Sequence, residues 1–193
     1  MKNLTRQLND SIKAKKSLIK IKKKLDLAIS TIYEKIKNGG KIMLCGNGGS
    51  AADAQHLAAE FLVKLKKKID RKPIPAITLA QDTSTLTAFS NDYNFDKQFA
   101  RCLEGLGNRN DVLIVISTSG NSKNILNVLK MSKKKKIFSI GFFGNNGGKA
   151  KVICDLPLIV SGNSTARVQE AHIFLGHYIF ECVENKLLKE KIL

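Results

Sequence analysis

Residues 41–50 read Lys-Ile-Met-Leu-Cys-Gly-Asn-Gly-Gly-Ser, an apolar run followed by a glycine-rich turn. Residues 111–122 have the same arrangement, with Asp-Val-Leu-Ile-Val-Ile leading into Ser-Thr-Ser-Gly-Asn-Ser. A strand that ends in small residues and opens a helix leaves free backbone N–H groups at the helix N-terminus, where the helix dipole favours an anion. Two such loops, the second rich in hydroxyls, predict a ligand with a phosphate at one end and polar groups along its length.

Strand-like and helix-like runs alternate along the rest of the chain. Apolar runs predict strands over 41–45, 74–79, 111–117, 136–142 and about 154–160. Helical runs are expected over 4–38, 50–66, pieces of 83–105, 122–134, near 147–152 and about 165–190. Gly39 and Gly40 end the first of these. The alternation predicts βαβ units, a parallel sheet with helices on both faces, and ligand loops at the carboxyl ends of the strands.

The composition is that of a globular chain. Its 193 residues, 43% of them hydrophobic, are enough for one domain with a proper core. No apolar run approaches the ~20 residues that span a bilayer, and residues 1–7 are polar. Four scattered cysteines without a Cys-x-x-Cys pair predict free thiols. We therefore expect a cytoplasmic protein.

The formal net charge of +17 comes mostly from lysine. Such a charge attracts nucleic acid or anionic sugar phosphates. The lysines gather near predicted helix ends and on the N-terminal helices, without interleaved aromatic residues. We interpret them as solvated helix faces and expect neither a nucleic-acid nor a membrane partner.

The three histidines lie on two predicted helices. His56 and Glu60 are four residues apart and therefore share a helix face. Such a pair can ligate a divalent metal or supply a base, although His/Glu neighbours are also common on exposed helices. His172 and His177 share the C-terminal helix, where five positions set them about 140° apart. We expect His172 to pack in the core or in an interface, and Arg167 to brace a carboxylate.

Four motifs occur in one order between residues 41 and 177. They read Cys-Gly-Asn-Gly-Gly-Ser-Ala-Ala-Asp-Ala-Gln-His-x-Ala-Ala-Glu, Ser-Asn-Asp-Tyr, Ile-Ser-Thr-Ser-Gly-Asn-Ser and Thr-Ala-Arg-Val-Gln-Glu-x-His-x-x-x-x-His. Together they resemble the bacterial phosphoheptose isomerases of the sugar-isomerase-domain (SIS) superfamily. The resemblance implies a three-layer αβα sandwich with a five-stranded, flavodoxin-like parallel sheet, extra N-terminal helices and a long C-terminal helix. Residues 1–193 would form a single SIS domain, with 1–38 as a helical extension.

The resemblance also implies an aldose–ketose isomerase with one zinc ion per subunit. Such an enzyme converts sedoheptulose 7-phosphate to D-glycero-D-manno-heptose 7-phosphate through an enediol, the first step of ADP/GDP-heptose biosynthesis for lipopolysaccharide or another glycan. The implied metal ligands are His56, Glu60, Gln169 and His177. The implied substrate contacts are Asn47, Gly48, Gly49, Ser50, Glu60, Asn91, Asp92, Ser117, Thr118, Ser119, Ser122 and Gln169. Glu60 and His177 are the expected acid/base pair. Some family members carry an acid at the position of Ala166, so no proton-transfer role is assigned there.

The resemblance implies a homotetramer, and helix geometry is consistent with active sites near subunit interfaces. Gln169 and His177 are eight residues apart, which on a straight helix is about 12 Å of rise and about 80° of rotation. One ion could take both side chains only at full stretch. Either Gln169 lies on a bent or non-helical first turn, or neighbouring subunits supply some of the ligands.

Two non-catalytic alternatives share this fold class. One is a SIS-fold protein that binds a replication initiator, and the other is a sugar-phosphate sensor. The first needs no catalytic set, whereas this chain has all four candidate ligands. The second would need a DNA-binding domain, and no helix-turn-helix segment stands out. The sequence therefore favours the enzyme.

Overall fold

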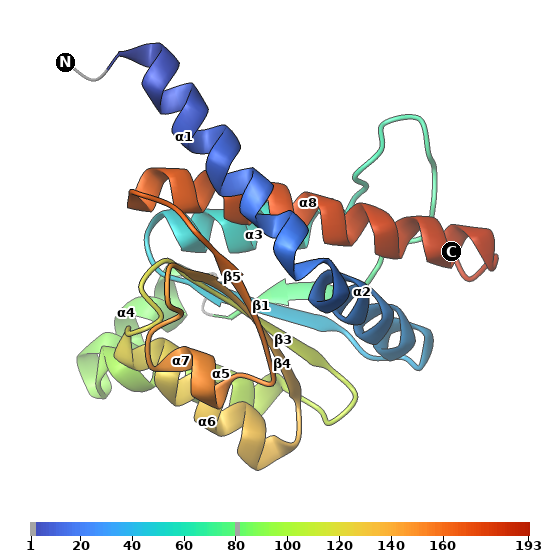
Figure 1. Ribbon diagram of the computed structural model, residues 1–193. Helices are drawn as coiled ribbons and strands as arrows, with labels where there is room; N and C mark the ends of the chain where they lie inside the picture. The colour runs from blue at the N-terminus through green and yellow to red at the C-terminus, as the bar shows by residue number, and fades with distance from the viewer. Residues whose placement is uncertain (1–2, 80–81) are drawn as a thin grey trace.

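The computed structural model describes residues 3–79 and 82–193. Its centre is one sheet of five parallel strands in the order β2-β1-β3-β4-β5 (Figure 1). The strands are β1 (Ile42–Gly46), β2 (Ala76–Thr78), β3 (Val112–Ser117), β4 (Phe138–Gly144) and β5 (Leu156–Val160). This is the strand order of flavodoxin-like sheets, which reverses between β1 and β3. The predicted fold class is confirmed.

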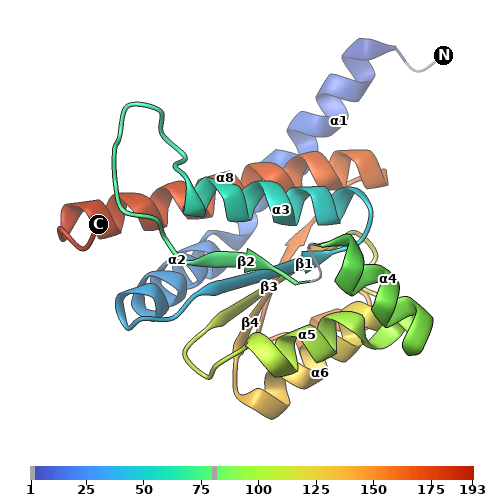
Figure 2. The same ribbon diagram turned by 180° about the vertical axis from the view of Figure 1, so that it is seen from behind.

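Helices cover both faces of the sheet. One face carries α1 (Leu4–Lys16), η1 (Ser17–Ile21), α2 (Lys22–Lys37), α3 (Gly49–Leu62) and α8 (Thr165–Lys189). The other carries α4 (Thr83–Asp92), η2 (Phe95–Lys97), α5 (Gln98–Leu106), α6 (Lys123–Lys135) and α7 (Ala150–Ile153). Figure 2 shows α3 lying alongside α8 above the sheet. None of the helices described has the length and apolar character needed to cross a bilayer.

The strands are apolar at consecutive positions because both faces of the sheet are buried. In β1, Ile42 and Leu44 pack with α2, α3 and α8, whereas Met43 and Cys45 pack with α5 and α6. A strand between two helical layers cannot alternate polar and apolar residues. This explains the continuous apolar runs that predicted the strands. No disulfide joins the four cysteines in the part of the chain that the structure describes.

The helical stretch expected over 4–38 is confirmed, although η1 divides it where the hydroxyl of Ser17 donates to the carbonyl of Ala14 (2.7 Å). One helix prediction was wrong in extent. The helix expected over 50–66 ends at Leu62, and an extended loop follows it to β2. The lysines at its expected end lie in that loop.

Asp111 connects the start of β3 to the start of β1. Its buried carboxylate accepts hydrogen bonds from the backbone N–H of Lys41 (3.0 Å) and of Asn108 (2.7 Å). The ammonium of Lys41 lies 2.6 Å from the same carboxylate. Since all three partners face one buried group, its removal leaves two backbone donors unpaired.

We expect Asp111→Ala to lower the free energy of unfolding by about 2–4 kcal/mol, because buried donors lose their acceptor. Urea denaturation would measure the loss. Asp26→Ala is the matched control, since Asp26 forms only an exposed i,i+4 pair with Lys22 (2.8 Å). The control should leave the midpoint almost unchanged. Equal shifts for the two variants would contradict the role given to Asp111.

Candidate active site

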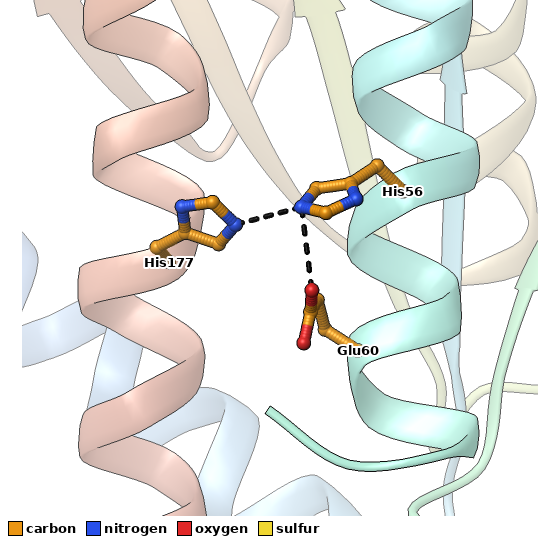
Figure 3. Close-up of side chains that lie close together, drawn as sticks. All are labelled: His56, Glu60 and His177. Carbon is orange, nitrogen blue, oxygen red and sulfur yellow. Dashed lines mark hydrogen bonds and ion pairs between the residues drawn. The ribbon is translucent and has the colours of Figure 1, made fainter. Parts of the chain in front are cut away.

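Three titratable side chains converge between α3 and α8. Nε2 of His56 lies 2.8 Å from Nε2 of His177 and 3.3 Å from Oε1 of Glu60 (Figure 3). The ligand atoms of all three residues lie within 4.8 Å of one another. His56 and Glu60 come from α3 and His177 from α8. One chain therefore brings together three of the four ligands that the sequence predicted.

The close packing of the two helices positions these side chains. A Cβ atom on Gly176 would lie 2.4 Å from Cδ1 of Leu57, so the absence of a side chain lets the helices approach. Farther along, the rings of Phe61 and Phe180 stack with centroids 3.8 Å apart. Leu57, Phe61 and Gly176 are sequence neighbours of His56, Glu60 and His177, respectively. Their packing therefore fixes the separation of the three polar side chains.

The electrostatics of the group favour a neutral His177. Burial lowers the pKa of this ring, the neighbouring His56 lowers it further, and Glu60 acts in the opposite direction. A neutral imidazole keeps a lone pair, which is the form that binds metal. His177 is therefore suited to ligation at neutral pH.

The donor set fits a zinc ion. Two imidazoles and a carboxylate are common zinc ligands, and bonds of ~2.0–2.2 Å at tetrahedral angles place ligand atoms about 3.3–3.5 Å apart. The distance of 3.3 Å between His56 and Glu60 meets this value. The two histidine nitrogens, 2.8 Å apart, would have to separate by about half an ångström. Small side-chain rotations would provide that separation.

Gln169, the fourth predicted ligand, lies against the start of α3. A Cβ atom on Gly49 would be 2.4 Å from Nε2 of Gln169, so the amide occupies the space that glycine leaves. Helix α8 is helical from Thr165, which places Gln169 beyond its first turn. Of the two alternatives that the sequence left open, a non-helical first turn at Gln169 is therefore excluded. The convergence of His56, Glu60 and His177 requires no second subunit.

The first glycine-rich loop is tied to α6. The side-chain amides of Asn47 and Asn124 exchange two hydrogen bonds (2.9 and 2.8 Å). Gly48 has φ +56° and precedes α3, while Ser50 is buried. The sequence interpretation missed Asn124, because a pairing across 77 residues leaves no local pattern. A cavity of about 340 Å³ opens beside the loop, next to Asn47, Gly48 and Thr78.

The second loop is held in shape by its own hydroxyls. Oγ of Ser117 accepts from the N–H of Gly120 (3.1 Å), and Oγ of Ser119 accepts from Asn121 (3.2 Å). Gly120 has φ +62°, and a Cβ there would lie 2.1 Å from the carbonyl oxygen of Gly147. Only glycine fits this position.

The loop presents donors to an incoming anion. Ser122 precedes α6, and within the described structure its side chain makes no capping bond. Thr118 and Ser122 are half-buried, whereas Ser119 is exposed. The N-terminus of α6 and these hydroxyls together form a candidate phosphate site.

Asn91 and Asp92 lie exposed at the C-terminal end of α4. The amide of Asn91 donates to the carboxylate of Asp92 (2.9 Å). Nothing in the described part of the chain joins the two to the histidines. One chain thus assembles the candidate metal ligands and both loops, but not these two predicted substrate contacts.

Two further predictions on α8 are confirmed. His172 is fully buried, with its ring centroid 6.2 Å from that of Phe142 on the sheet. Arg167 lies 2.6 Å from the carboxylate of Glu170, and it also donates to the backbone carbonyl of Gln7 (3.3 Å). His172 is a core residue, and Arg167 braces a carboxylate.

Burial lowers the pKa of His172 from 6.5 to about 4. The unfolded chain therefore binds a proton that the folded chain excludes, and stability should fall as pH drops from about 6.5 to about 4. Between these two pH values the His172 ring lowers the free energy of unfolding by up to about 1.4 kcal/mol for each pH unit of acidification. His172→Gln should remove this part of the dependence, as measured by urea denaturation at several pH values. Parallel curves for parent and variant would contradict the expectation.

Comparison with known proteins identifies close relatives along the whole chain. Residues 7–144 match the family model of the SIS domain. The phosphoheptose isomerase of Clostridium acetobutylicum is 46% identical over 196 aligned positions, which cover 100% of this chain and 99% of the relative. A solved phosphoheptose isomerase from Neisseria gonorrhoeae superposes with a TM-score of 0.86 at 39% identity, covering 94% of this chain and 97% of that one. A solved phosphoheptose isomerase from Francisella tularensis superposes with a TM-score of 0.88 at 32% identity, covering 94% of this chain and 96% of that one.

Proposed function

Because this chain belongs to the phosphoheptose isomerases of the SIS-domain family, we propose that it interconverts sedoheptulose 7-phosphate and D-glycero-D-manno-heptose 7-phosphate. The observation that carries the proposal is the convergence of His56, Glu60 and His177 between α3 and α8. A protein that only binds a replication initiator or senses a sugar phosphate has no use for this convergence. The product would enter heptose biosynthesis in the cytoplasm.

The reaction moves one proton between C1 and C2 of the sugar through an enediol. Glu60 is the proposed base, which takes the proton from C1 and returns it to C2. His177 is the proposed acid, which donates a proton to the carbonyl oxygen at C2 and recovers one from the hydroxyl at C1. Its lowered pKa means that the neutral ring makes this donation, and neutral imidazole serves as such a donor in other isomerases.

His56, Glu60, Gln169 and His177 are proposed to hold one zinc ion per subunit. When bound, the ion supplies Lewis-acid polarisation of the carbonyl. Glu60 has two carboxylate oxygens, so one can face the ion while the other exchanges the proton. The neutral ring of His177 keeps its lone pair available for the ligand role.

The two loops are proposed to orient the substrate. Ser117, Thr118, Ser119 and Ser122 would hold the phosphate with the N-terminus of α6. Asn47, Gly48, Gly49 and Ser50 would contact the sugar, as would Gln169. A phosphate fixed at one end keeps C1 and C2 beside Glu60, and this positioning raises the effective concentration of the base.

We also propose a homotetramer with active sites at or near subunit boundaries. Asn91 and Asp92 are exposed and apart from the histidines, so a neighbouring subunit would have to bring them to the substrate. Large apolar side chains are exposed on α1, η1 and α8, among them Ile12, Ile19 and Phe174. Residues 1–193 would act as a single SIS domain, with 1–38 as its helical extension.

Purified protein supplied with zinc should convert sedoheptulose 7-phosphate to the aldose, and Glu60→Gln should lower kcat by about 100-fold or more. The amide keeps the size of the side chain but cannot take the proton. Glu34→Gln, an exposed change on α2, is the control and should leave kcat unchanged. Zinc content and melting temperature of both variants must be measured alongside. No turnover by the parent would contradict the proposed function, and near-parental turnover by Glu60→Gln would remove its role as base.

Ser119→Ala combined with Ser122→Ala should raise KM at least about tenfold. Each hydroxyl lost from a phosphate oxygen removes a charge-assisted hydrogen bond worth about 1.5–3 kcal/mol. Steady-state kinetics would measure KM, with Ser90→Ala on the exposed face of α4 as the control. An unchanged KM in the double variant would place the phosphate on residues 46–50 instead.

A further inference from the structure

Arg71 connects the C-terminal end of α3 to α8. Its guanidinium is fully buried, as is the carboxylate of Glu184, and Nε donates to Oε1 of Glu184 at 2.5 Å. Nη2 donates to the backbone carbonyl of Glu60 and Nη1 to that of Phe61, both at 2.9 Å. One side chain therefore completes the last turn of α3 and pairs with a charge on α8.

This pair lies directly behind the candidate metal ligands. One of the two carbonyls belongs to Glu60 itself, so Arg71 holds the backbone of a ligand. Glu184 is seven residues after His177, which is about two helical turns, so both lie on the same side of α8. Phe180 lies between His177 and Glu184 along α8, and its ring stacks on that of Phe61, whose carbonyl Arg71 also binds. Arg71 and Glu184 thus join the two helix segments that carry Glu60 and His177.

Stability alone does not account for a buried ion pair of this kind. Removing two charges from water has a large desolvation cost, and apolar residues of similar volume often stabilise a protein as well or better. The fork of a guanidinium, in contrast, fixes direction, because its N–H groups reach several acceptors in one plane. Here the acceptors are the end of α3 and a carboxylate on α8. Such a connection sets the position of one helix relative to the other.

The same loop and helix also make an exposed ion pair nearby. Lys66 lies 3.2 Å from the carboxylate of Glu181 and 2.5 Å from the amide oxygen of Asn185, at the surface of α8. Within the described residues the ammonium of Lys66 does not bond to the backbone of α3. This exposed pair is therefore a matched control for the buried one.

We propose that Arg71 and Glu184 are positioning residues that hold α3 against α8 and thereby set the spacing of Glu60 and His177 for metal binding. The inference rests on the proposed function, because it concerns the ion that these ligands would hold. Metal–ligand distances must be met within about 0.2 Å, so a movement of α3 larger than side-chain rotations can compensate weakens the site. Residues behind the ligands of other metal sites change affinity by about 10- to 100-fold when they are replaced.

The test is a Co²⁺ titration of metal-free protein, followed by the absorption bands of the bound ion, and it needs no catalysis. Arg71→Met combined with Glu184→Leu removes both charges and keeps apolar volume. We expect this variant to keep its melting temperature near that of the parent, to bind Co²⁺ at least about tenfold more weakly and to shift the bands. Lys66→Met should bind as the parent does. Unchanged affinity and bands in the folded double variant would overturn the proposal.

A second variant covers the case in which the double variant does not fold. Arg71→Lys keeps the charge beside Glu184 but loses the fork, so it should also bind Co²⁺ more weakly, and parental affinity there would overturn the proposal. A parent that binds Co²⁺ without converting sedoheptulose 7-phosphate contradicts only the proposed function. A parent that converts the sugar, beside a double variant with full Co²⁺ affinity, contradicts only the positioning role. A parent that binds no Co²⁺ contradicts both.

Discussion

The contact between α3 and α8 is the constraint on which the candidate site depends. Gly176 leaves room for Leu57, where a Cβ atom would approach to 2.4 Å, and this lets the two helices pack closely. His177 follows Gly176 on α8 and His56 precedes Leu57 on α3, so their ring nitrogens meet at 2.8 Å. The burial of apolar side chains supplies the free energy for this contact. The side chains of His56, Glu60 and His177 are therefore positioned by the apolar packing of the two helices rather than by the polar contacts among them.

The parallel sheet places the two loops side by side. Strands β1 and β3 are neighbours in register, so the loops at their carboxyl ends emerge next to each other. The amide pair of Asn47 and Asn124 then ties the first loop to the helix that follows the second. A ligand could therefore reach the hydroxyls of the second loop and the first loop without any rearrangement of the strands. The strand order thus determines which motifs can act on one molecule.

Local sequence patterns made the strands and part of the candidate site predictable. The strands follow from apolar runs, and His56 and Glu60 share a face because of helical periodicity. The meeting of His56 with His177 spans 121 residues and depends on how α3 packs against α8, which no periodicity contains. The pair of Arg71 and Glu184 spans 113 residues and was not predicted for the same reason. The early end of α3 also escaped prediction, because the side chain that completes its last turn comes from the following loop.

The two histidines of α8 show how environment decides the use of a residue type. Five positions turn His172 toward the sheet and His177 toward α3. Full burial lowers the pKa of His172 to about 4, which keeps the ring neutral but leaves it out of reach of any substrate. His177 is only partly buried, with a second imidazole and a carboxylate beside it, so its neutral ring faces groups with which it can share an ion. A lowered pKa is common to both, and only the neighbours distinguish the core histidine from the candidate ligand.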